Sequence, residues 1–190
     1  MPLNQCFLEL FVQKKTRADD TVIQIGKKSF LNNLFNKFEF FFLTSKNKYS
    51  FYNKGRYTLN NIGEINNKID FVPDVVIFHW ITNFLNPKVM IDLKNIYNPK
   101  FFWYLMDFEP LTGGCHALWG CQGYQKYCEK CPALKWPIKN RAKKTFNKKK
   151  KIIDTLDIST LSASSSLKAK IEKSTLFSKK KIFDLMIGID

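Results

Sequence analysis

The sequence predicts an α/β fold in which a parallel sheet is built from strands joined by crossover helices. Two near-continuous apolar runs, 74–80 (DVVIFHW) and 101–105 (FFWYL), are typical of strands buried on both faces of such a sheet. Segments with helical periodicity follow these runs, and this alternation favours crossover connections. Hydrophobic residues form 45% of the 190-residue chain, which is enough for a packed core and excludes a wholly disordered protein.

The N-terminal part is predicted to contain one strand and one amphipathic helix. Residues 6–12 (CFLELFV) read as a strand, and 14–20 form a polar turn. Within 30–42, leucines and phenylalanines recur at helical spacing, which predicts a helix packed on the core. A helix lying on a membrane surface is the alternative, but its polar face would be richer in lysine. Residues 46–68 are polar and are expected to be loop with one short helix.

The rest of the chain is predicted to alternate between strand and helix, with Ser165 as the N-cap of the last helix. The expected strands are 74–80, 101–105, 156–163 and 181–187, and the expected helices are 86–97, 135–151 and 167–176. In open parallel sheets, ligands bind beyond the carboxyl ends of the strands. This rule selects three places, which are His79-Trp80, Met106-Asp107 and residues 162–166.

The charge is strongly positive, with a net value of +15. Such a surface attracts phosphates, anionic lipid head groups or nucleic acid. Only Arg17, Arg56 and Arg141 are arginines, and arginine is the usual reader of base edges, so no sequence-specific nucleic-acid partner is expected. An AT-rich genome would also produce this abundance of Lys, Asn, Phe and Ile. The segment 135–151 has nine basic and no acidic residues, which fits either a solvated helix face or contact with an anionic membrane.

Neither apolar segment of the N-terminal part is expected to target or cross a membrane. The first is interrupted by Glu9 and follows no basic residue, unlike a signal peptide. The second, 30–43, is too short and too polar to span a bilayer. We therefore expect a cytoplasmic protein. A cytoplasmic protein attached peripherally to the inner membrane face is the alternative expectation.

The most informative stretch is a cysteine-rich loop, 112–132 (TGGCHALWGCQGYQKYCEKCP). Its cysteines follow the spacing C-x5-C-x6-C-x2-C, and they are Cys115, Cys121, Cys128 and Cys131. Three interpretations stay open. In the first, the thiolates bind a structural zinc ion, with His116 as an alternative ligand. In the second, the cysteines only pack the loop and are reduced or partly disulfide-bonded. In the third, Cys128 and Cys131 form a redox centre of the C-x-x-C type. Loops of this length usually have a function, and Gly113-Gly114 permits a close backbone approach.

The string 107–116 (DFEPLTGGCH), followed by Gly120-Cys121, Tyr124, Cys128 and Cys131-Pro132, resembles a segment of bacterial group 1 glycosyltransferases. These GT-B enzymes build surface and capsular polysaccharides. Their strand end of Asn-Leu-His-Trp type is similar to Phe78-His79-Trp80, and their closing Pro-Asn-Gly-Ile-Asp is similar to Gly188-Ile189-Asp190. The sequence departs from the pattern at Met106, where the family has His, and at Glu109, where it has Trp.

The resemblance implies that residues 1–190 form the N-terminal, acceptor-side Rossmann-like domain of such an enzyme, one half of a GT-B fold, with 112–132 as a loop insertion. The family's first strand and its C-terminal donor domain are expected to be missing, so the chain alone is expected to be incomplete and inactive. The implied reaction is a metal-independent, retaining transfer of a sugar from a nucleotide-sugar donor to a polysaccharide or lipid-linked acceptor.

The residues that the strand ends and the resemblance select fall into two groups. The catalytic candidates are Asp107 and His79, and the acceptor-binding candidates are Trp80, Glu109, Thr112, Gly113, Gly114 and His116. No cofactor is required for transfer, and a structural zinc ion at the four cysteines is the one metal considered. The alternative function is a metal-stabilised basic module that binds nucleic acid or an anionic surface without catalysis.

Overall fold

The computed structural model describes residues 8–12, 14–16, 18–26, 47–51, 57, 59–135 and 138–185. In chain order, its elements are β1 (Leu10–Val12), β2 (Val22–Gln24), η1 (Asn47–Tyr49), α2 (Gly63–Asn66), β3 (Val75–Phe78), α3 (Pro87–Tyr97), β4 (Lys100–Leu105), η2 (Glu109–Leu111), η3 (Gly123–Gln125), α4 (Asn140–Leu156), β5 (Ser159–Ser162), α5 (Ser165–Glu172) and β6 (Ile182–Asp184).

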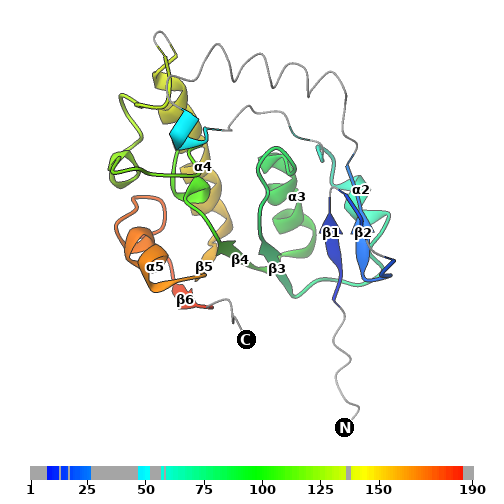
Figure 1. Ribbon diagram of the computed structural model, residues 1–190. Coiled ribbons are helices and arrows are strands. Elements are labelled where there is room, and N and C mark those ends of the chain that lie inside the picture. The colour runs from blue at the N-terminus through cyan, green and yellow to red at the C-terminus, as the bar shows by residue number, and fades with distance from the viewer. Residues whose placement is uncertain are drawn as a thin grey trace.

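The main sheet has four parallel strands in the order β3-β4-β5-β6, so the predicted α/β fold is confirmed. The helices α3, α4 and α5 make the three crossovers between successive strands. In Figure 1, α5 lies beside β6, and α3 lies above β3 at the other end of the sheet. Because all four strands point the same way, their carboxyl ends meet at one edge of the sheet.

The core lies between this sheet and its crossover helices. Trp103 and Leu105 of β4 are buried, as are Val89 of α3 and Phe146 and Ile153 of α4. In α3 the side chain of Asn86 accepts a hydrogen bond from the backbone N–H of Lys88, and Pro87 occupies the first turn. These features fix where α3 begins, because they satisfy or remove N–H groups that have no partner within the helix.

A second, two-stranded parallel sheet joins β1 to β2. The sequence predicted one strand there, over 6–12, and missed β2. In Figure 1 this pair lies beyond α3 and next to α2. A hydrogen bond of 3.1 Å from the Gly26 N–H to Oε2 of Glu64 ties the end of β2 to α2, and Phe11 and Ile23 pack against the core.

Several predicted boundaries of α4, β5 and α5 are wrong. The helix expected over 135–151 is α4, which spans Asn140–Leu156. Leu156, which was expected in the next strand, is a buried residue of this helix. The helix ends there because Asp157 adopts a left-handed conformation with φ of 51°. The N-cap of α5 is Ser164 instead of Ser165, since its hydroxyl accepts a hydrogen bond from the N–H of Leu167. This helix ends at Glu172, before the predicted end at 176.

Several predictions concern residues outside the described part of the chain. They are the amphipathic helix over 30–42, residues 6–7 and 186–187 of the two terminal strands, and the closing 188–190 motif. Both terminal strands are shorter than predicted, since Leu8, Glu9 and Leu185 are described and lie outside β1 and β6. Among the helices that are described, none combines the length and the apolar character that crossing a bilayer requires.

Candidate functional site

Asp107 follows β4 at the carboxyl edge of the main sheet, and its carboxylate is held on both oxygens. Oδ1 accepts a hydrogen bond of 2.9 Å from the N–H of Glu109, which starts the η2 turn. Oδ2 lies 2.6 Å from Nδ1 of His116. The contact is largely shielded from water, since the His116 side chain is 8% exposed. Asp107 therefore joins the end of a core strand to the cysteine-rich loop.

The His116 ring is fixed on a second side by Trp80, which follows β3. The two rings stack with their centroids 4.6 Å apart and an interplanar angle of 13°. The backbone N–H of His116 lies 3.2 Å from the carbonyl oxygens of Tyr49 and Ser50. Trp80 itself is 61% exposed, so an apolar ring is presented at the surface directly above the Asp107–His116 pair.

His79, the other histidine of the chain, lies in the same place. Its ring meets the ring of Tyr104 edge to face, with centroids 5.3 Å apart. Partial burial lowers the pKa of His79 below its ordinary value, because burial disfavours the charged imidazolium. His79, Trp80, Met106 and Asp107 line one narrow crevice of about 10 Å³, which is room for about one water molecule.

Glu109 is buried and paired with a lysine of α4. Nζ of Lys149 lies 2.5 Å from Oε1 of Glu109 and also donates to the carbonyl oxygens of Glu109 and Thr112, at 2.6 and 3.0 Å. A buried carboxylate requires such a partner, since an isolated charge is costly away from water. The sequence selected Glu109 to bind an acceptor. In the structure Glu109 lines the crevice, and its carboxylate is held in the ion pair with Lys149.

Thr112, Gly113 and Gly114 do not line the crevice with His79 and Asp107. The Thr112 hydroxyl donates to the carbonyl oxygen of Cys115 and accepts from the N–H groups of Gly114 and Cys115. Gly113 packs on α4 so closely that a Cβ there would lie 2.3 Å from the carbonyl oxygen of Ala142. These three residues, selected to bind an acceptor, thus lie in the internal packing of the loop.

A larger cavity, of about 620 Å³, adjoins the crevice and shares Ile81, Thr82, Trp103 and Glu109 with it. We call it the basic cavity, because one face of α4 lines it with Arg141, Lys144, Lys148, Lys149 and Lys151. Glu109, the acidic residue of its lining, is paired with Lys149. This cavity was not predicted from the sequence, although basic residues at helical spacing along 141–151 are a signal for such a face.

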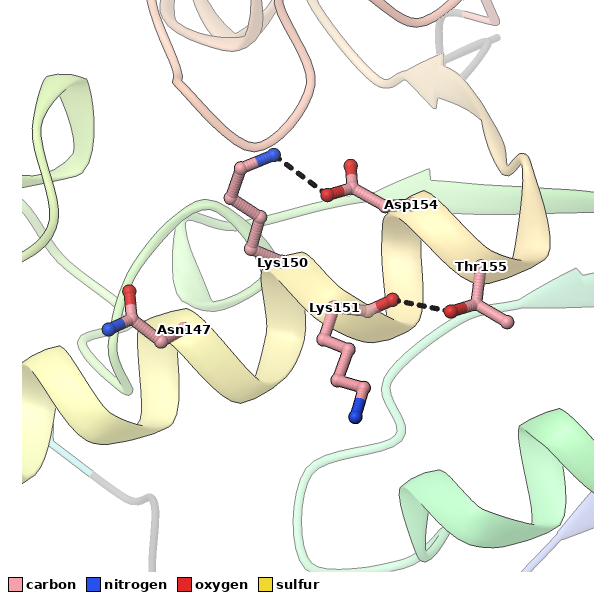
Figure 2. A pocket seen from close by; sticks show the side chains of 5 residues that line it. All are labelled: Asn147, Lys150, Lys151, Asp154 and Thr155. Carbon is pink, nitrogen blue, oxygen red and sulfur yellow. Dashed lines mark hydrogen bonds and ion pairs between the residues drawn. The ribbon is translucent and has the colours of Figure 1, made fainter.

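Another pocket, which is open and has a volume of about 530 Å³, lies along α4. Figure 2 shows the residues that line it, Asn147, Lys150, Lys151, Asp154 and Thr155. Nζ of Lys150 is 2.8 Å from Oδ2 of Asp154, and the Thr155 hydroxyl donates to the carbonyl oxygen of Lys151. Because the carboxylate of Asp154 neutralises Lys150, this open pocket attracts anions less strongly than the basic cavity does.

The four cysteines of the loop line one small cavity of about 20 Å³. All four are free thiols. The Cys115 thiol is hydrogen-bonded to Cys131, which raises the pKa of Cys115 and lowers that of Cys131. Burial raises the pKa of Cys128 to about 12. Across the described ranges, no three His, Cys, Asp or Glu side chains stand ready as a metal-ligand group.

Comparison of the chain with protein-family models, with curated proteins and with solved structures gives no match in any of the three.

Proposed function

We propose that this chain is an acceptor-side domain of a glycosyltransferase, which presents a sugar acceptor to a nucleotide-sugar donor. One observation carries the proposal. His79, Trp80 and the Asp107–His116 pair converge at the carboxyl edge of a parallel sheet, where ligands of such folds bind. The sequence resemblance to group 1 glycosyltransferases selects these same residues.

The exposed face of Trp80 offers an apolar platform on which a sugar ring can lie. His79 stands next to it, and its lowered pKa keeps the imidazole neutral at pH 7. A neutral imidazole can accept a hydrogen bond, and then a proton, from a hydroxyl group. We assign to His79 the contact with the acceptor hydroxyl. Asp107 and His116 hold Trp80 in place, so their proposed role is to position the ring on which the sugar lies.

The basic cavity supports an acceptor that bears phosphate, because its lysines lie beside the crevice. A phosphate placed there would leave the attached sugar near Trp80 and His79. The donor and its departing diphosphate would be bound by a second domain, which the resemblance assigns to the C-terminal half of the enzyme. The domain by itself is proposed to bind acceptor without transferring sugar, at the cytoplasmic face of a membrane that holds lipid-linked acceptors.

The acceptor assignment is tested with glucose 1-phosphate and glucose as probes, monitored through tryptophan fluorescence. Glucose 1-phosphate should quench the fluorescence and bind at least tenfold more tightly than glucose. Because Trp80→Ala also removes the fluorescent reporter, binding to this variant is measured by calorimetry, and its affinity for both sugars should fall. Lys148→Ala should weaken the binding of glucose 1-phosphate alone. Lys179→Ala removes the same charge from an exposed position that does not line the basic cavity, and it should change neither probe. Equal affinity for the two sugars in all four proteins would contradict the proposal.

The second candidate function is a basic module that binds polyanions, and the basic cavity favours it too. It predicts that inorganic polyphosphate and DNA compete equally with glucose 1-phosphate, with a steep dependence on salt concentration. It also predicts that Trp80→Ala leaves all these affinities unchanged. The same titrations therefore separate the two functions.

A further inference from the structure

We propose that Cys115, Cys121, Cys128 and Cys131 bind one structural zinc ion inside the loop 112–132. This site shares no lining residue with the crevice at the sheet edge. It would give the loop a fixed shape and, through Cys115, fix the position of His116.

The first argument is convergence on a space of the right size. All four cysteines line the same cavity, and its volume of about 20 Å³ accommodates a single atom. Cys115 and Cys131 are already hydrogen-bonded to each other. The sulfurs of Cys121 and Cys128 lie 3.4 and 3.8 Å from the point that a Cβ on Gly123 would occupy, so they flank one glycine. Four thiolates around one ion form the tetrahedral set that structural zinc prefers.

The second argument is that backbone N–H groups point at the sulfurs. The N–H of Gly113 donates to Sγ of Cys128 at 3.2 Å, and the N–H of Gly123 donates to Sγ of Cys121 at 3.4 Å. Cys131 accepts from the N–H groups of Ala133 and Leu134. Ligands of structural metals are held by such donors, which orient them and offset their negative charge. A thiol that only fills space does not require them.

The third argument is the shape of the loop. Between η2 and α4 its described elements are limited to the single turn η3, so a hydrogen-bonded ladder does not hold it. Cys128 and Lys130 have φ of 51° and 50°, a conformation that costs energy for residues with a side chain. These residues form the tight turn between Cys128 and Cys131, the spacing typical of half a zinc site.

Binding requires the cysteine side chains to reorient, because among the described residues the thiols as they stand do not form a ligand set. A disulfide between Cys115 and Cys131 is the competing arrangement. It uses two of the four sulfurs and gives no reason for the N–H groups directed at Cys121 and Cys128. His116, the alternative ligand, does not line the cavity, and its Nδ1 faces Asp107. The geometry thus favours a site made of four cysteines.

The test uses elemental mass spectrometry to measure the metal content of the 190-residue chain, after purification under reducing conditions and dialysis. We expect one zinc per chain, loss of the metal in Cys128→Ser, and full retention in Cys6→Ser, the control at the cysteine outside the loop. Should Cys128→Ser fail to fold, the wild-type chain is stripped with a chelator and loaded with Co²⁺. Tetrahedral thiolate coordination then produces intense visible absorption, and added zinc removes it. A metal-free chain that folds, gains no absorption with Co²⁺ and has all five of its thiols reactive would overturn the proposal. A Cys115–Cys131 disulfide found in the intact protein would overturn it as well.

Discussion

Nδ1 of His116 lies 2.6 Å from Oδ2 of Asp107, and the same histidine ring is stacked on Trp80. This contact joins the carboxyl end of β4 to the cysteine-rich loop, and the stacking extends it to the end of β3. Three segments that are separate in sequence thereby form one surface.

Asp107→Asn should reduce the affinity for glucose 1-phosphate about tenfold, a loss of about 1.4 kcal/mol. The amide carries no charge to hold the imidazole, so Trp80 loses its fixed support. The matched control is Asp184→Asn, which alters an exposed carboxylate at the end of β6 that pairs with Lys168 of α5. Fluorescence titration compares the three proteins. Affinities that fall equally in both variants would show that charge in general, and not the position of His116, governs binding.

Lys149→Met should destabilise the fold by about 3–5 kcal/mol, because it leaves the buried carboxylate of Glu109 without its cation. Urea unfolding measures the loss. Adding Glu109→Gln to this variant should restore much of the stability, since the double variant buries no net charge. If the single and double variants are equally unstable, the ion pair is not the cause.

Gly113→Ala should cost about 1–3 kcal/mol of stability, the usual penalty for overpacking. The added Cβ would lie 2.3 Å from the backbone oxygen of Ala142, which cannot move without displacing α4. Gly63→Ala is the control, since its Cβ would meet only the side chain of Asn61, at 3.3 Å. Thermal unfolding of both variants checks this. An unchanged melting temperature for Gly113→Ala would mean that the loop and α4 are not in close contact.

His79 should titrate below its ordinary pKa of 6.5, as measured by NMR of its ring protons. The unfolded chain then binds this proton more tightly than the folded chain does. The stability contributed by His79 is therefore present above pH 6.5 and is lost as the pH falls through the pKa of the folded state. In His79→Gln this part of the pH dependence should disappear. A measured pKa above 6.5 would contradict the assignment of a neutral His79 as hydrogen-bond acceptor.

The sequence predicted the chain order of the strands of the main sheet well, because β3 and β4 are near-continuous apolar runs and the helices have clear signals. The Asn86-Pro87 start of α3 is one such signal. Burial on both faces was wrong for β3, since Val75 and Ile77 are 47% and 46% exposed. The sequence missed β2, since Val22–Gln24 is three residues long and lies between polar turns. It also placed the start of the strand after α4 too early, because the apolar Leu156 belongs to the inner face of that helix. A leucine fits the buried face of a helix and a buried strand equally well, so the residue type at position 156 does not distinguish the end of α4 from the start of β5.

The candidate site was predicted in part. The rule that ligands lie beyond the strand ends selected His79, Trp80 and Asp107, and the structure brings these residues together. The rule did not reveal that Asp107 would face His116, since that contact depends on how η2 turns the chain back. Nor did it reveal the ion pair of Glu109 with Lys149, which joins residues far apart in the chain.

The most direct test of the proposed function is calorimetric titration of the folded chain with nucleoside diphosphates and nucleotide sugars, with and without a supplied C-terminal domain of a group 1 glycosyltransferase. We predict that the donor binds only when the second domain is present, and that a phosphorylated acceptor sugar binds in both cases. Absence of donor binding with the second domain, together with absence of acceptor binding by a chain shown to be folded, would contradict a role in sugar transfer.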